Sequence, residues 1–157
     1  MKIVYMKDTI VLFLNKTYIQ RIDFTNKEAT EKYIKGLLFK LKDSYGLTFK
    51  GYYDINLHVD ICYGVIIEII KEELEYFDYF NNQVEINTKI INDSFLYEVT
   101  DIDQFENAKF KIYFYNNNFY LQVLDKQIDM GEVLEFTNRI IYGKEVCDVL
   151  KKALVVR

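Results

Sequence analysis

The sequence predicts an α+β fold: an antiparallel sheet built from hairpins, one long amphipathic helix after an N-terminal meander, and one or two C-terminal helices. Residues 48–61 alternate between polar and apolar side chains, which is the period of a strand with one buried face. Apolar residues between 29 and 41 recur at spacings of three and four, which is the period of a helix. The predicted strands come in groups, and this grouping favours α+β over a parallel doubly wound sheet.

Apolar runs separated by turn residues predict the hairpins of the sheet. The predicted strand pairs are 2–6 with 10–14, 48–61 with 65–70, 83–91 with 95–99, and 110–115 with 119–124. Residues 18–24 add a third strand to the first pair. The last two turns contain asparagines, at Asn92 and at Asn116 to Asn118, and asparagine tolerates the positive φ that tight turns require. The run 65–70 is apolar on both faces except at Glu68, so we expect it in the centre of the sheet.

The long helix has a predicted start and a predicted end. Thr25-Asn26-Lys27-Glu28 has the spacing of a capping box, in which the Thr25 hydroxyl accepts a hydrogen bond from the backbone N–H of Glu28. Gly46 supplies the C-terminal stop. The apolar stripe of this helix is expected to cover the sheet, while Lys27, Glu31, Lys35 and Lys42 form its solvent face.

Two helices are predicted near the C-terminus. The apolar residues from Met130 to Ile141 follow helical spacing after the cap residue Asp129, and Gly143 ends that helix. Residues 144–155 then predict a short closing helix. The earlier segment 71–82 mixes acidic and aromatic residues and predicts either a short helix or a loop.

Length and composition limit the class of protein. The 157 residues fit one domain, and we predict that residues 1–157 form a single globular domain. Half of the residues are hydrophobic, which excludes a disordered chain. The apolar runs are much shorter than the roughly 20 residues of a membrane span, and the N-terminus lacks a signal-peptide pattern, so we expect a cytoplasmic protein without a membrane partner. Cys62 and Cys147 are expected to be unlinked thiols.

The charge of the chain is unevenly distributed. Residues 53–106 hold 13 acidic and 2 basic side chains, a net charge of −11, whereas residues 15–52 hold 4 acidic and 8 basic ones, a net charge of +4. A strongly acidic block repels phosphate backbones and attracts basic partners. The sequence therefore disfavours nucleic acid as a partner.

No motif for nucleotide binding, metal-dependent hydrolysis or a nucleophile elbow is present, so the sequence predicts no catalytic residue and no cofactor. One alternative is a small metal- or ligand-binding enzyme on the polar face of residues 48–61. Asp54, His58 and Asp60 project to the same side there, with about 6.6 Å between alternate residues. Imidazole and carboxylates are metal ligands, and His58 is the only histidine available as a general base, with Cys62 as the nearest nucleophile in sequence.

The favoured hypothesis is a non-catalytic interaction domain, an adaptor or regulator that binds a basic protein through an acidic, aromatic surface. Aromatic side chains surrounded by acidic ones are typical of an interface anchor with an electrostatic rim. The residues predicted to bind the partner are Glu72, Glu73, Glu75, Tyr76, Phe77 and Tyr79. A third hypothesis is an accessory protein that acts by self-association.

The hairpin from Tyr113 to Leu121 and the Tyr142-Gly143-Lys144 segment weakly resemble bacterial adaptor domains that recruit substrates to proteases. The resemblance implies a role in protein recruitment. It covers a minor part of the chain and implies no site residue.

Overall fold

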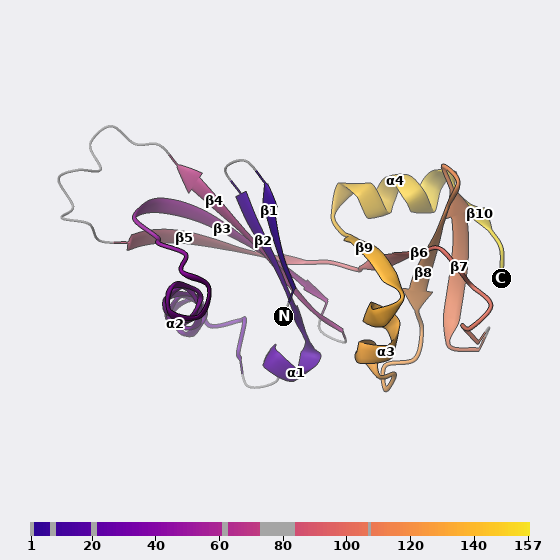
Figure 1. Cartoon of the computed structure of the whole chain (residues 1–157), viewed down its shortest axis with the longest axis horizontal. Coiled ribbons are helices and arrows are strands. Elements are labelled where there is room, and N and C mark those ends of the chain that lie inside the picture. The colour runs from indigo at the N-terminus through magenta and orange to yellow at the C-terminus, as the bar shows by residue number, and fades with distance from the viewer. Residues whose placement is uncertain (1, 7–8, 20–21, 61–62, 73–83, 107) are drawn as a thin grey trace. The chain divides into compact units, whose positions relative to one another are not determined.

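A computed structural model describes residues 2–6, 9–19, 22–60, 63–72, 84–106 and 108–157 (Figure 1). Its internal contacts divide the chain into two compact units, one made of Met1–Val59 and Gly64–Ile91 and the other of Asp60–Tyr63 and Asn92–Arg157. Each unit contains a five-stranded, mostly antiparallel sheet together with helices, so the predicted α+β class is confirmed. That residues 1–157 fold as a single domain stays a prediction.

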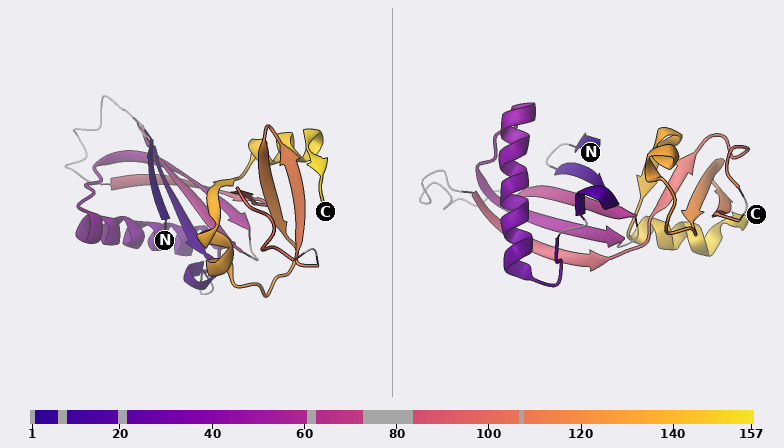
Figure 2. Two further views of the ribbon diagram at one scale, coloured as in Figure 1. Left: turned by 45° about the vertical axis from the view of Figure 1, so that its right-hand side comes forward. Right: turned by 90° about the horizontal axis from the view of Figure 1, so that it is seen from below.

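The first unit is a sheet with one long helix on it. Its strands are β1 (Lys2–Met6), β2 (Thr9–Asn15), β3 (Gly51–Asp60), β4 (Gly64–Glu72) and β5 (Val84–Asn92), and its helices are α1 (Lys16–Ile19) and α2 (Lys27–Tyr45). The strand order is β1-β2-β4-β3-β5, so the central position predicted for residues 65–70 is confirmed. Figure 2 shows α2 crossing over the strands of this sheet.

The predicted third strand at residues 18–24 is wrong, because the chain turns into α1 after β2. The Asn15 side chain accepts a hydrogen bond from the backbone N–H of Thr17 at 3.0 Å. Such a local bond favours a helical turn over continued strand pairing. The first two strands of the meander are confirmed, and they pair antiparallel.

The start of α2 differs in detail from the predicted capping box. Asn26 is the N-cap, and its side chain accepts a hydrogen bond from the N–H of Ala29 at 3.1 Å. The Thr25 hydroxyl instead donates to the carboxylate of Asp23. The predicted end is confirmed, since Gly46 adopts φ 67° and its N–H bonds to the carbonyls of the last helical turn.

The core of the first unit lies between α2 and the sheet. The helix buries Ile34, Leu38 and Leu41, which pack with apolar strand residues that include Ile55, Leu57, Val65 and Ile67. Along β3 the odd-numbered residues are fully buried, and all the even-numbered ones except His58 are partly exposed. The period-two prediction for this strand is therefore confirmed.

The second unit has its own five-stranded sheet and two helices. Its elements are β6 (Leu96–Val99), β7 (Phe110–Tyr115), β8 (Asn118–Val123), α3 (Met130–Glu135), β9 (Thr137–Ile141), α4 (Lys144–Lys152) and β10 (Leu154–Val155). The strand order is β10-β7-β8-β6-β9. The predicted β7–β8 hairpin is confirmed, and Asn116 and Asn117 have the expected positive φ values of 50° and 63°.

Two expectations about pairing and helices are corrected in this part of the chain. The strands β5 and β6 do not form the predicted hairpin, because they belong to different sheets. The predicted helix from Met130 to Ile141 ends at Glu135, and its second half is the strand β9. β-Branched side chains such as those of Thr137 and Ile141 disfavour helix and favour strand, and β6 supplies a pairing partner.

The helix α4 covers one face of the second sheet. Its Val146 and Val149 pack on a cluster that contains Tyr113, Tyr120 and Ile141. The closing helix is shorter than predicted, since it ends at Lys152 and the next residues pair with β7 as β10. No helix in the described ranges has the length and apolar character that a bilayer span requires.

Candidate functional site

The acidic, aromatic stretch predicted to bind a partner lies almost wholly outside the described residues. Glu73, Glu75, Tyr76, Phe77 and Tyr79 fall there, and the role predicted for them stays a prediction. Glu72 is described: it is the last residue of β4 and is partly buried.

The carboxyl of Glu72 lies beside that of Asp54 on the neighbouring strand β3. The pKa of Glu72 is raised because its carboxyl shares a hydrogen bond with Asp54 and because the negative charge of Asp54 disfavours a second one nearby. Asp54 also accepts a hydrogen bond from the Asn87 amide on β5, at 3.4 Å. The Glu72 carboxyl therefore holds its proton more tightly than the carboxyl of an isolated glutamate does.

The other residues of the predicted metal site have separate partners. His58 is buried, and its Nε2 lies 2.6 Å from a carboxylate oxygen of Glu68 on β4. Asp60 accepts a hydrogen bond from the backbone N–H of Phe95 at 3.4 Å. Four strand residues, about 13 Å, separate Asp54 from His58.

Because of this spacing, the structure does not bring the three side chains together. In the ranges that the structure describes, no three histidine, cysteine or acidic side chains are grouped so that they could hold a metal ion. Cys62 lies outside those ranges, and Cys147 is exposed on α4. The strand-face enzyme therefore stays a prediction, without geometric support from the described residues.

One concave surface of the first unit lies on one flank of α2. It is an open pocket of about 470 Å³ between the part of α2 from Lys35 to Lys42, Phe49 just before β3, and the start of β5. The side chains that line it are Lys35, Leu38, Phe39, Lys42, Phe49, Val84 and Glu85. We call this surface the α2 pocket.

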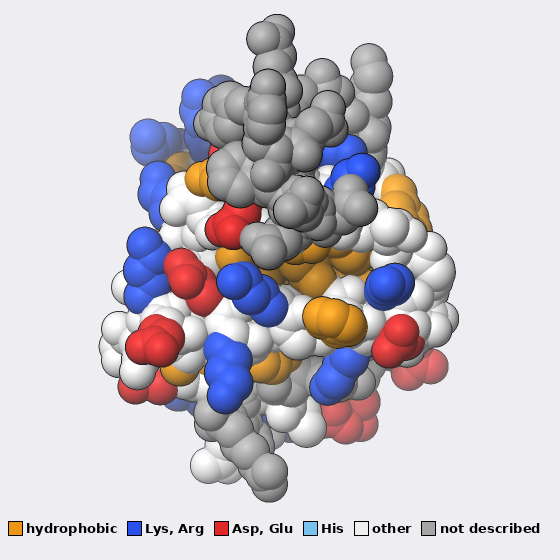
Figure 3. Space-filling view, turned by 90° about the vertical axis from the view of Figure 1, so that its left-hand side faces the viewer, with side chains coloured by type: hydrophobic (Ala, Val, Ile, Leu, Met, Phe, Trp, Pro, Cys, Tyr) orange, Lys and Arg blue, Asp and Glu red, His pale blue; other side chains and the backbone are white. Residues whose placement is uncertain are grey.

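The α2 pocket combines an apolar surface with charged side chains at its edge. Phe39 is 69% exposed, although phenylalanine is a residue that proteins usually bury. Figure 3 shows apolar side chains gathered at the centre of this face between basic and acidic ones. Both lysines are exposed, and neither forms an ion pair within the described part of the chain.

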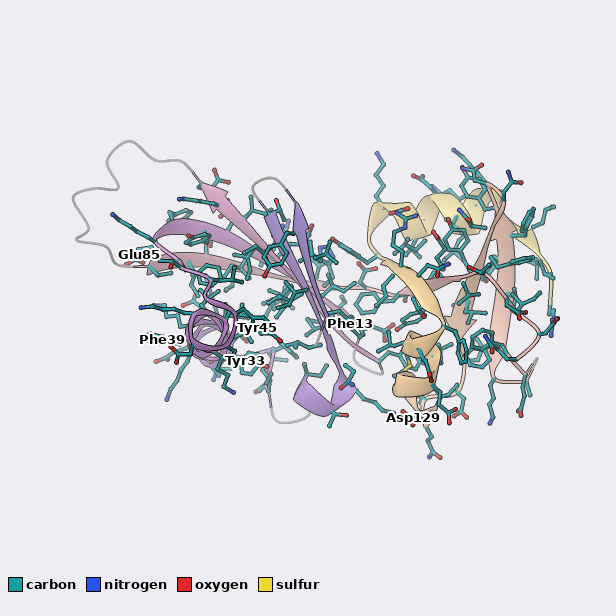
Figure 4. The ribbon with its side chains drawn as sticks, viewed as in Figure 1. Phe13, Tyr33, Phe39, Tyr45, Glu85 and Asp129 are labelled. Carbon is teal, nitrogen blue, oxygen red and sulfur yellow. The ribbon has the colours of Figure 1, made fainter. Side chains whose placement is uncertain are left out.

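A second pocket, of about 410 Å³, lies on the opposite flank of the same helix. The side chains that line it are Ile22, Asp23, Ala29, Lys32, Tyr33, Gly36, Leu37 and Lys40. Partial burial raises the pKa of Tyr33 above its ordinary value. Figure 4 shows Tyr33 and Phe39 on opposite flanks of α2, with Phe39 on the side of Glu85.

Sequence reasoning missed the α2 pocket, although one signal for it was present. Lys35 and Lys42 were assigned to an ordinary solvent face, and that assignment agrees with their exposure. Phe39 lies outside the apolar stripe that the helical period predicts, which places a large aromatic side chain on the predicted solvent face. Val84 and Glu85 line the pocket because β5 lies next to β3, and this strand order was not predicted from the sequence.

Comparison with known proteins gives no assignment. The chain matches no family model, and no curated protein or solved structure is significantly similar to it.

Proposed function

We propose that this chain is a non-catalytic protein-interaction domain, an adaptor or regulator, which binds a segment of another protein in the α2 pocket. The observation that carries the proposal is the exposed Phe39 side chain on the wall of an apolar pocket. Covering the exposed part of a phenylalanine removes roughly 130 Å² of apolar surface from water, which is worth about 3 kcal/mol. A partner that covers Phe39 thus gains a binding free energy of the size found at interface hot spots.

The form of the pocket favours a protein segment over a small molecule. Sites for small molecules enclose most of the ligand surface, typically 70–90%. Here Phe39 and the two lysines are exposed on one wall, so a compact ligand would remain largely in solvent. A polypeptide can place one side chain in the pocket and extend over the surrounding helix surface. The expected compartment for this interaction is the cytoplasm.

The acidic, aromatic stretch that begins at Glu72 is a second proposed surface, and it suits a basic partner. Charge reversal at Glu72, Glu73 and Glu75 tests it. If binding to the partner is unchanged by these reversals across salt concentrations, this second surface is not used.

The α2 pocket is tested by affinity capture with matched variants. The tagged wild type, Phe39→Ser and Phe136→Ser are each incubated with lysate of the source cell, and bound proteins are quantified by mass spectrometry. Phe136 is the control because it is also an exposed aromatic residue, at 45%, and lies in the second unit. We expect a stoichiometric partner with the wild type and with Phe136→Ser that is lost with Phe39→Ser; equal recovery with all three contradicts the proposal.

A further inference from the structure

Resting on the proposed function, we infer that the segment bound in the α2 pocket is acidic, with one large apolar side chain flanked by carboxylates. The apolar side chain packs beside Phe39 and Leu38, and the carboxylates meet the ammonium groups of Lys35 and Lys42. This partner has the opposite charge to the one predicted for the acidic stretch.

The spacing of the two lysines defines the pattern of the segment. Lys35 and Lys42 are seven residues apart on α2, which corresponds to two turns and about 10.5 Å along the helix axis. Leu38 and Phe39 lie between them on the same wall. An extended segment covers that distance with about three residues. The inferred pattern therefore has two acidic residues about three positions apart, with the apolar side chain between them.

The wall of the pocket that α2 forms has the charge that such a segment requires. Among the described residues that line it, two are lysines and Glu85 is the single carboxylate. The helix as a whole carries five lysines and three acidic residues. The positive field of this helix therefore attracts an acidic segment and repels a basic one.

The opposite flank of α2 provides a control for this inference. Lys32 and Lys40 line the second pocket, and they are two exposed lysines on the same helix. Replacing both of these lysines by glutamate changes the net charge of the protein by the same amount as replacing Lys35 and Lys42 by glutamate. A difference between the two double variants therefore reports on position and not on total charge.

The experiment uses a library of random twelve-residue peptides displayed on bacterial cells. The library is sorted against the wild type, Phe39→Ser, the double variant Lys35→Glu with Lys42→Glu, and the double variant Lys32→Glu with Lys40→Glu. We expect the wild type and the Lys32/Lys40 variant to enrich peptides with an apolar residue between acidic ones. The Lys35/Lys42 variant is expected to enrich basic peptides instead, and Phe39→Ser neither kind.

Binding of the enriched peptides in solution gives the quantitative test. With fluorescence anisotropy, an acidic peptide is expected to bind the Lys35/Lys42 variant at least about tenfold more weakly than the wild type, because two exposed ion pairs are lost and two glutamates repel the peptide carboxylates. The Lys32/Lys40 variant should lose less, about twofold to threefold, because its lysines do not line the α2 pocket, although Lys32 lies one turn from Lys35. The far-ultraviolet circular dichroism of each variant verifies that it is folded.

Failure of the inference and failure of the proposed function give different results. If peptides depend on Phe39 but are not acidic, or bind the Lys35/Lys42 variant as well as the wild type, the acidic partner is overturned and the pocket remains a binding site. If no enriched peptide depends on Phe39, the α2 pocket is not a binding site and the proposed function is overturned as well.

Discussion

Leu41 and Phe39 are two positions apart on α2, but the structure gives them opposite roles. Leu41 is fully buried against the sheet, whereas Phe39 is 69% exposed at the α2 pocket. Replacing Leu41 by alanine removes about 2 kcal/mol of transfer free energy, and the cavity left behind raises the total loss of stability to about 3–4 kcal/mol. Phe39→Ser is expected to change the free energy of unfolding by less than about 0.5 kcal/mol, because serine and phenylalanine have similar helix propensities.

Urea unfolding of the wild type and the two variants, followed by circular dichroism at 222 nm, measures both values. The contrast between the variants is the informative quantity, since they share a helix and an assay. A loss above about 1.5 kcal/mol for Phe39→Ser would mean that Phe39 contributes to the core. The α2 pocket would then lack the exposed side chain on which the proposed function rests. A loss below about 1 kcal/mol for Leu41→Ala would refute the packing of α2 on the sheet.

Three further predictions concern the backbone and the carboxyl pair. A Cβ on Gly64 would clash with the Leu14 carbonyl oxygen, so Gly64→Ala should cost about 1–3 kcal/mol in the same urea assay. Gly36→Ala is the control, since its Cβ meets nothing within 4 Å, and it should be neutral or stabilising. Asn117 has φ 63°, so Asn117→Val should lower stability by about 1–2 kcal/mol while Asn117→Gly does not, and equal thermal midpoints for the two would contradict the turn geometry. Asp54→Asn should lower the pKa of Glu72 towards its ordinary value in a carbon-13 NMR titration, and an unchanged titration would show that the two carboxyls do not interact. Because the folded-state pKa of Glu72 is raised, the contribution of Glu72 to stability is present at low pH and is lost as the pH rises through that pKa.

Local chemistry was enough to predict several elements from the sequence. The alternation of β3 shows in the sequence because one face of the strand contacts the core and the other does not. The stop at Gly46 and the positive φ of Asn116 and Asn117 follow from the conformational preferences of those residues alone. In such cases the residue itself supplies the physical cause, so no tertiary contact is needed.

Two of the errors occurred where a pairing partner outweighed the local pattern. Residues 137–141 have apolar positions that fit a helix, but β6 pairs with them as a strand. The strands β5 and β6 are joined by a turn-like Asn92-Asp93, yet they belong to different sheets. In both cases the decision depends on hydrogen bonds to residues far away in sequence, which a local pattern does not contain.

The candidate site divides in the same way. The sequence by itself determined the α+β class, the charge of each segment, and the outward direction of Asp54, Asn56 and Asp60. Only the tertiary structure decided that His58 pairs with Glu68 on the adjacent strand, and that Lys35 and Phe39 line one pocket together with Val84. The physical reason is that a binding surface is formed by residues from separate elements, and strand order and helix packing, which bring them together, follow from the packing of the whole core.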